Sequence, residues 1–181
     1  IVYYFWSYYQ VEKKFVPLNF VVPTGNFGNV YAGFVSKCMG LPIKKLVVCS
    51  NKNDILTRFF STGSMIKRRV LKSLSPSMDI QVSSNFERLI FYYLKNGNKT
   101  SELFNEMEEK GKFSISKKLL SSILKEFLGG KLSDDMTTQT IKKIYQKYDI
   151  ITDPHTAVGY SVGKKLLENH DKRIYLSTAH Y

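Results

Sequence analysis

The chain has 181 residues, of which 43% are hydrophobic and 23% are charged; this balance is typical of a globular domain and excludes a disordered protein. The formal net charge of +12 favours an acidic ligand or a nucleic acid as a partner. The basic residues are nevertheless spread along the chain, and the one dense run, at 67–72, belongs to no recognised nucleic-acid module.

The first ten residues, IVYYFWSYYQ, are apolar and aromatic. They lack the basic flank and the cleavage site of a signal peptide, and they are too few to cross a bilayer. We interpret them as part of a buried helix. Because the sequence also stops directly after a strand-like stretch at 174–176, we expect the chain to be a piece of a longer protein.

A βαβ unit is predicted between residues 20 and 49. An apolar run with β-branched residues at 20–22 precedes a turn rich in glycine and asparagine at 24–29. Apolar residues then recur every four positions, which predicts a helix over about 30–39, and 45–49 has the pattern of a buried strand. This order is typical of a parallel sheet, so the predicted fold class is α/β.

The two cysteines are Cys38, in the predicted helix, and Cys49, in the second predicted strand. They form neither a disulfide framework nor a metal-ligand pair. We expect both to be buried apolar fillers, in keeping with a reducing compartment.

The remaining elements are mostly helical. The pattern predicts helices at 53–60, 84–94, 101–109, 116–128, 135–148 and from 153 onward, a loop with some helix at 63–76, and a last strand at 173–177. Ser84 and Glu87 form a capping box, and Gly129 and Gly130 are predicted to end the fourth helix. The predicted organisation is an α/β core at 1–95, a helical insertion at 96–150 and a return to the core at 151–181.

The turn at 24–29 suits a phosphate. Gly25 and Gly28 allow a close approach of the backbone, and the first N–H groups of the next helix lack internal partners at the positive end of the helix dipole. Asn26 and Asn29 can add donors or cap the helix. The spacing matches neither the dinucleotide fingerprint nor a P-loop, so a tight strand-to-helix turn with an asparagine cap is the alternative interpretation.

VPTGNFGNVYAGFVSKCMGLPIKKLVV resembles the phosphate-loop region of threonine synthases. Further segments resemble that family in the same order: SNKNDILTRFFSTG at 50–63, LSPSMDIQVSSNFERL at 74–89, DPHTAVG at 153–159 and STAH at 177–180. The opening helix is also similar, and the resemblance covers nearly the whole chain but is weakest over 96–150. It identifies the chain as a C-terminal part of such an enzyme.

The resemblance implies a pyridoxal 5′-phosphate (PLP) enzyme of fold type II, the tryptophan synthase β-like architecture, here incomplete. It implies a carbon–oxygen lyase that converts O-phospho-L-homoserine and water into L-threonine and phosphate. A cytoplasmic enzyme with a small-molecule substrate is expected, without nucleic-acid, membrane or metal partners, and its oligomeric state stays open.

The resemblance also implies residue roles. Five residues match the loop that wraps the PLP phosphate: Gly25, Asn26, Phe27, Gly28 and Asn29. Thr178 matches the residue near the pyridine nitrogen, where a hydroxyl leaves that nitrogen largely unprotonated.

Other candidates are substrate contacts. Ser83, Ser84, Asn85 and Arg88 suit the substrate's phosphate or carboxylate, or else form only a capping box and a surface ion pair. His155 is a candidate for lining the pocket, although a capping or packing role is the alternative. His180 adjoins Thr178 and is a candidate for positioning it.

No catalytic residue is assigned within the chain. In the family, the lysine that binds the cofactor's aldehyde precedes the phosphate loop in a Phe-Lys-Asp motif, and Lys13 and Lys14 lack that context. We therefore expect the chain alone to be inactive. The alternatives are a threonine-synthase-like phospho-lyase acting on a related phosphorylated amino acid, a non-catalytic fragment that binds phosphate or nucleic acid, and a remnant without a function of its own.

Overall fold

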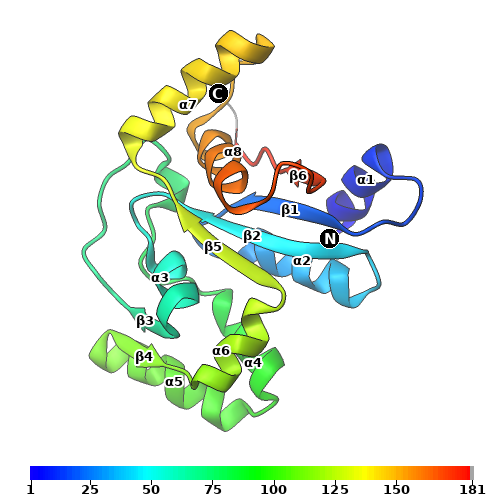
Figure 1. The fold of residues 1–181 in the computed structure, drawn as a ribbon. Coiled ribbons are helices and arrows are strands. Elements are labelled where there is room, and N and C mark those ends of the chain that lie inside the picture. Colours follow the sequence, from blue (N-terminus) through cyan, green and yellow to red (C-terminus); the bar gives the residue numbers. More distant parts are fainter. Residues whose placement is uncertain (180–181) are drawn as a thin grey trace.

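The computed structural model describes residues 1–179 and contains a main sheet with helices on both faces (Figure 1). The strands are β1 (Leu18–Pro23), β2 (Ile43–Ser50), β3 (Ser64–Ile66), β4 (Lys112–Ser114), β5 (Phe127–Lys131) and β6 (Arg173–Tyr175). The helices are α1 (Val2–Val11), α2 (Gly28–Cys38), α3 (Ile55–Thr62), α4 (Phe86–Leu94), α5 (Gly97–Lys110), α6 (Lys117–Leu124), α7 (Asp134–Tyr148) and α8 (Pro154–Leu166), with a short 3₁₀ helix, η1 (Pro76–Met78).

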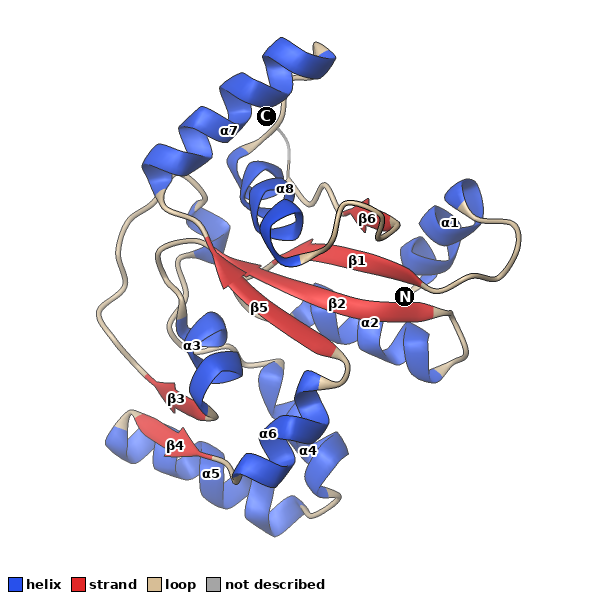
Figure 2. Cartoon of the chain, viewed as in Figure 1, coloured by secondary structure: helices blue, strands red, loops and turns tan. Residues whose placement is uncertain are grey.

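The main sheet has the strand order β5-β2-β1-β6, and every neighbouring pair is parallel (Figure 2). Strand β1, loop, α2 and β2 form the predicted βαβ unit. The predicted α/β class with a parallel sheet is therefore confirmed. A separate antiparallel pair, β3 with β4, joins the segment after α3 to the segment after α5.

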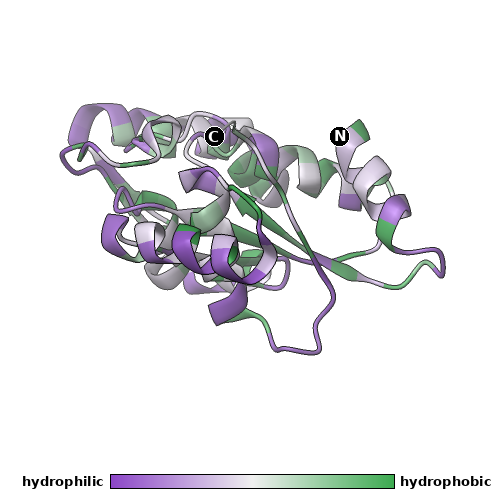
Figure 3. Ribbon diagram, turned by 90° about the horizontal axis from the view of Figure 1, so that it is seen from above, coloured by the Kyte–Doolittle hydropathy of each residue, from purple (hydrophilic) through white to green (hydrophobic). Residues whose placement is uncertain are grey.

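The two faces of the main sheet bury different residues because successive side chains of a strand alternate between faces. Phe20 and Leu46 point into the larger cluster, shared with α1 to α6, whereas Val21 and Val47 belong to the smaller cluster with Val158 of α8. Figure 3 shows the strands as hydrophobic and the outer helices as largely hydrophilic. A parallel sheet needs this cover on both faces.

The helix predicted over 116–128 is present but ends earlier than predicted. Helix α6 ends at Leu124, and Phe127–Lys131 forms β5, which pairs with β2. The two glycines do not end a helix but permit close packing on each face of the strand. A Cβ on Gly129 would lie 2.8 Å from Phe60 Cδ2, and one on Gly130 would lie 2.6 Å from Val162 Cγ1. The region 96–150, predicted as a helical insertion, thus also contributes a strand to the main sheet.

Three further expectations differ from the structure. Ser84 does not cap α4, because Asn85 occupies the N-cap position and makes no side-chain cap bond. Cys38 is exposed, whereas Cys49 is buried as predicted, and burial raises the pKa of the Cys49 thiol. Helix α1 is only partly buried: Tyr4 and Tyr8 face the core, but Trp6 is 65% exposed.

Within residues 1–179, no helix is long and apolar enough to cross a membrane. Over the same residues, no group of three or more His, Cys, Asp or Glu side chains is arranged to hold a metal ion.

Candidate functional site

The glycine-rich turn lies where β1 ends and α2 begins. The Thr24 N–H donates to the Cys49 carbonyl of β2 at 3.0 Å, and this bond fixes the start of the turn. The Phe27 N–H then donates to Thr24 Oγ1 at 3.1 Å, and Phe27 itself adopts the left-handed conformation with φ 63°. This conformation is strained for a residue with a side chain, so the surrounding packing must hold it.

Phe27 is held by its ring, which is fully buried and packs edge-on against Phe86 with the ring centroids 5.0 Å apart. Its N–H is already bonded to Thr24, and it does not line the cavity described below. The Phe27 ring therefore anchors the turn to the core, and the predicted place of Phe27 in a phosphate-binding loop stays a prediction.

A cavity of about 290 Å³ opens beside the turn. It is lined by Pro23, Thr24, Gly25, Asn26, Gly28, Asn29, Ser77, Met78, Asn85, His155, Thr178 and Ala179. The structure thus brings together most of the predicted site residues from segments that are far apart in the sequence. The carboxyl ends of parallel strands meet at one edge of a sheet, which is where α/β folds place ligands.

Four backbone N–H groups at this cavity have no hydrogen-bond acceptor among the described residues: those of Gly25, Asn26, Gly28 and Asn29. Gly28 and Asn29 are the first two residues of α2, so their N–H groups lie before the first intrahelical bond, from Tyr31 to Phe27. Unpaired donors at a helix N-terminus favour an anion.

The turn is supported from behind by residues that sequence reasoning did not select. The Tyr4 hydroxyl of α1 donates to the Asn29 carbonyl at 2.8 Å and to Asn29 Oδ1 at 3.0 Å. Burial raises the pKa of Tyr4, so the hydroxyl stays protonated and remains a donor. The only sequence signal for this role was the four-residue spacing of Tyr4 and Tyr8 in an apolar helix.

The segment before α4 also contacts the turn. Ser83 Oγ donates to the Gly25 carbonyl at 3.0 Å, Ser84 Oγ donates to Asn26 Oδ1 at 2.8 Å, and Asn85 Nδ2 donates to the Asn26 carbonyl at 2.8 Å. Of these three, only Asn85 lines the cavity. The predicted substrate contacts thus bond to the loop itself.

Arg88 lies outside the cavity. Its guanidinium stacks over the Tyr31 ring, 4.7 Å from the centroid, and donates to Asn85 Oδ1. The structure therefore does not bring Arg88 together with the other candidates, except through Asn85.

The chain is similar in sequence and structure to threonine synthases, although no protein-family model matches it. The chain is 43% identical to threonine synthase of Saccharomyces cerevisiae over 199 aligned positions, and 40% identical to that of Pseudomonas aeruginosa over 182; these matches cover 98% and 99% of the chain. The structure of PLP-bound threonine synthase from Brucella melitensis superposes with a TM-score of 0.95 at 40% identity, and the yeast structure with 0.92 at 41%.

The chain is a homologue of threonine synthases. In each of these four comparisons it spans 39% of the length of the matched protein, so it corresponds to a part of that protein. The fold expected from the resemblance is confirmed by the same superpositions.

Four of the five segments that resemble threonine synthase contribute residues to the cavity, and the segment at 50–63 does not. His155 joins the cavity from α8. Asp153 caps this helix: its Oδ1 accepts the His155 N–H at 2.8 Å and lies 3.0 Å from His155 Nδ1. His155 is 9% exposed, and its Nε2 is buried without a partner in the part of the chain that the structure describes. The ring is therefore oriented by Asp153 and keeps one nitrogen available.

Thr178 follows β6 closely in the chain and lines the same cavity as the turn. Its neighbour Ser177 is exposed and tied to α8, because Thr156 Oγ1 donates to Ser177 Oγ at 3.2 Å. His180, the candidate for positioning Thr178, lies outside the described residues.

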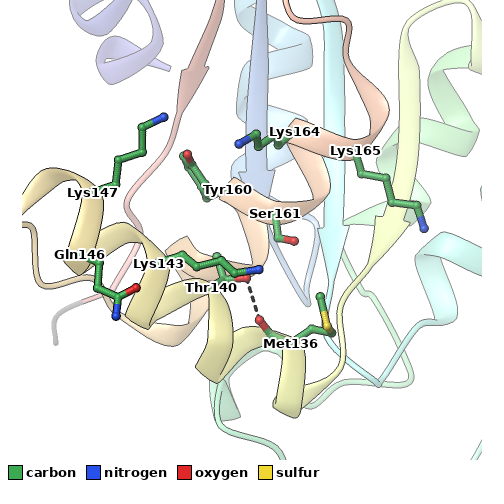
Figure 4. A pocket seen from close by; sticks show the side chains of 9 residues that line it. All are labelled: Met136, Thr140, Lys143, Gln146, Lys147, Tyr160, Ser161, Lys164 and Lys165. Carbon is green, nitrogen blue, oxygen red and sulfur yellow. Dashed lines mark hydrogen bonds between the residues drawn. The ribbon is translucent and has the colours of Figure 1, made fainter.

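A larger cavity, of about 550 Å³, lies between α7 and α8 (Figure 4). Its basic side chains are Lys143, Lys147, Lys164 and Lys165, which the close-up shows reaching from both helices around Tyr160. None of the predicted site residues lines it. Its α7 wall lies in the region where the resemblance to threonine synthase is weakest.

Proposed function

We propose that the chain supplies the phosphate-binding part of the cofactor site of a threonine synthase, a PLP-dependent enzyme that converts O-phospho-L-homoserine and water into L-threonine and phosphate. The observation that carries this proposal is the set of unpaired N–H groups, from Gly25, Asn26, Gly28 and Asn29, around one cavity. The homology to threonine synthases supports PLP as the cofactor.

The residues present fit the phosphate of PLP. Neutral N–H groups at a helix start stabilise a dianion without the desolvation cost of a buried cation. Gly25 and Gly28 keep the turn free of side chains: a Cβ on Gly28 would lie 3.2 Å from Asn85 Nδ2. When bound, PLP supplies an electron-withdrawing ring that makes the α-proton and the phosphate of the substrate easier to remove.

We assign two further cavity side chains, Thr178 and His155, to the ring and the substrate. Thr178 offers the pyridine nitrogen a hydroxyl instead of a carboxylate, so the nitrogen gains no proton from it. His155, oriented by Asp153, presents Nε2 as a hydrogen-bond partner for the substrate or for water that adds to it.

The lysine that binds the aldehyde of PLP, in this proposal, belongs to a part of the protein outside this chain. The chain alone then binds the phosphate but performs no turnover, and the proposed location is the cytoplasm. Activity on a related phosphorylated amino acid is the second candidate, but no contact of the described residues favours it.

A chimera tests the function directly. The corresponding segment of the Saccharomyces cerevisiae threonine synthase is replaced by this chain, and phosphate release from O-phospho-L-homoserine is measured. We expect activity that needs PLP, and its loss in the matched Gly25→Val chimera. An inactive chimera that is folded and retains PLP would refute the assignment of substrate.

Binding by the chain itself is tested with pyridoxine 5′-phosphate, which has no aldehyde and so cannot react with surface lysines. We expect shifts in the ¹⁵N-resolved amide resonances of residues 25–29. Pyridoxine, which lacks the phosphate, is the matched control and should leave them unchanged. Equal shifts with both compounds would contradict a phosphate loop.

A further inference from the structure

All hydrogen bonds between residues 83–85 and the turn run in the same direction, from donors in 83–85 to acceptors in the turn. Residues 83–85 supply only donors, and Gly25 and Asn26 supply only acceptors. Asn26 Oδ1 accepts twice, from the N–H and the Oγ of Ser84, both at 2.8 Å. Every oxygen of these two loop residues is therefore occupied, while their N–H groups remain unpaired among the described residues.

This direction of the hydrogen bonds favours the binding of an anion. A carbonyl or amide oxygen that turned toward the cavity would repel a phosphate, and a bond that holds the oxygen on the other side removes that repulsion. Asn85 shows the same design, since Arg88 donates to its Oδ1 and Tyr31 stacks on Arg88. The amide of Asn85 is thereby fixed with Nδ2 toward the Asn26 carbonyl.

The segment that carries these donors is itself anchored. Asp79 accepts four hydrogen bonds: from Asn51 Nδ2 at 2.8 Å, from Asn53 Nδ2 at 2.9 Å, and from the N–H and Oγ of Ser73 at 2.9 and 2.5 Å. Asn51 and Asn53 follow β2 and are almost fully buried. Residues 73–85 are thus tied at one end to the sheet and at the other end to the turn.

We propose that Ser83, Ser84 and Asn85 are positioning residues that hold the oxygens of Gly25 and Asn26 away from the cavity, so that their N–H groups stay aligned for a phosphate. Ser83 and Ser84 lie outside the cavity lining and act only through the loop, whereas Asn85 also lines the cavity. The identity of the anion rests on the proposed function, but the ordering of the loop does not.

The test uses the full chain with Ser84→Ala, with Ser84→Thr to restore a hydroxyl, and with Ser121→Ala as control, since Ser121 is exposed on α6. Three quantities are measured: the ¹⁵N order parameters of Gly25 and Asn26, the Kd for pyridoxine 5′-phosphate, and the urea midpoint. The first reports loop order on the picosecond-to-nanosecond scale without any activity.

We expect Ser84→Ala to lower both order parameters and to raise the Kd by about 2- to 12-fold, the range for one lost hydrogen bond. Ser84→Thr should recover both values, and Ser121→Ala should change neither. The urea midpoint should move little, because Ser84 lies at the surface.

Two results would overturn the proposal. Unchanged order parameters and Kd in Ser84→Ala would show that these bonds do not organise the loop. A raised Kd with unchanged order parameters would indicate a direct contact with the ligand. If instead the wild-type chain binds no pyridoxine 5′-phosphate but Ser84→Ala still disorders the loop, positioning is supported and the proposed function fails.

Discussion

Replacing Gly25 by alanine tests how tightly the turn is enclosed. The added Cβ would lie 2.9 Å from Ile80 Cδ1, 3.0 Å from Met78 Cα and 3.0 Å from the Ser77 carbonyl oxygen, whereas ordinary contacts begin at 3.4 Å. Two of these three atoms belong to the backbone and cannot rotate away. The turn and the segment at 77–80 must therefore separate by about 0.4 Å or more, as in an overpacked core.

The expected cost follows from this geometry. Overpacking costs about 1–3 kcal/mol, and the lower entropy of the unfolded alanine chain offsets about 0.4–1 kcal/mol of it. We expect a net loss of about 1–2 kcal/mol in the free energy of unfolding. Because the displaced N–H groups face the cavity, we also expect the Kd for pyridoxine 5′-phosphate to rise by about tenfold for each 1.4 kcal/mol of lost alignment.

Urea denaturation followed by circular dichroism measures the first quantity, and amide titration measures the second. Gly97→Ala is the matched control, because no atom lies within 4 Å of its added Cβ. Ile80→Ala removes only the side-chain contact, so it should not rescue Gly25→Ala. Rescue by Ile80→Ala, or wild-type stability and binding in Gly25→Ala, would refute the reasoning.

Three further outcomes are expected. Gly130→Ala should lose about 1–3 kcal/mol of stability because its Cβ would strike Val162, and Val162→Ala in the same chain should recover part of it in a double-mutant cycle; additive losses would contradict direct contact. Burial raises the pKa of Asp54, but hydrogen bonds from Lys131 and Arg58 outweigh it and hold that pKa below its usual value. The ionised carboxylate of Asp54 therefore stabilises the fold at pH values above the usual aspartate pKa, so Asp54→Asn should lower the urea midpoint at pH 7. The difference in urea midpoint between the wild type and the variant should close as the pH falls below about 4. A difference that does not change with pH would exclude this linkage. In the active chimera, Thr178→Ala should reduce kcat more than PLP retention, and unchanged turnover would remove Thr178 from the site.

The sequence predicted what depends on neighbours along the chain. The βαβ unit followed from local periodicity and from the glycines at 25 and 28. The structure places β1, α2 and β2 within a few residues of the predicted ranges. The parallel arrangement also followed, because strand, helix, strand allows few other connections.

What the sequence could not predict depends on distant partners. Ser84 has the pattern of a helix cap, but its hydroxyl bonds to Asn26, 58 positions earlier. Gly129 has the pattern of a helix end, but it lies in β5, where any side chain would clash with Phe60. The meeting of His155 with the turn came only from the family resemblance, since no local pattern relates the start of α8 to a turn more than a hundred positions earlier.

The pairing of β6 with β1 has a consequence for folding. Asn19 donates through its N–H and its Nδ2 to the Lys172 carbonyl, across 153 positions of sequence. Contacts of such long range are slow to form, because the intervening chain must first be brought together. Until β6 arrives, β1 presents a bare edge to other molecules, so refolding yield should fall as protein concentration rises.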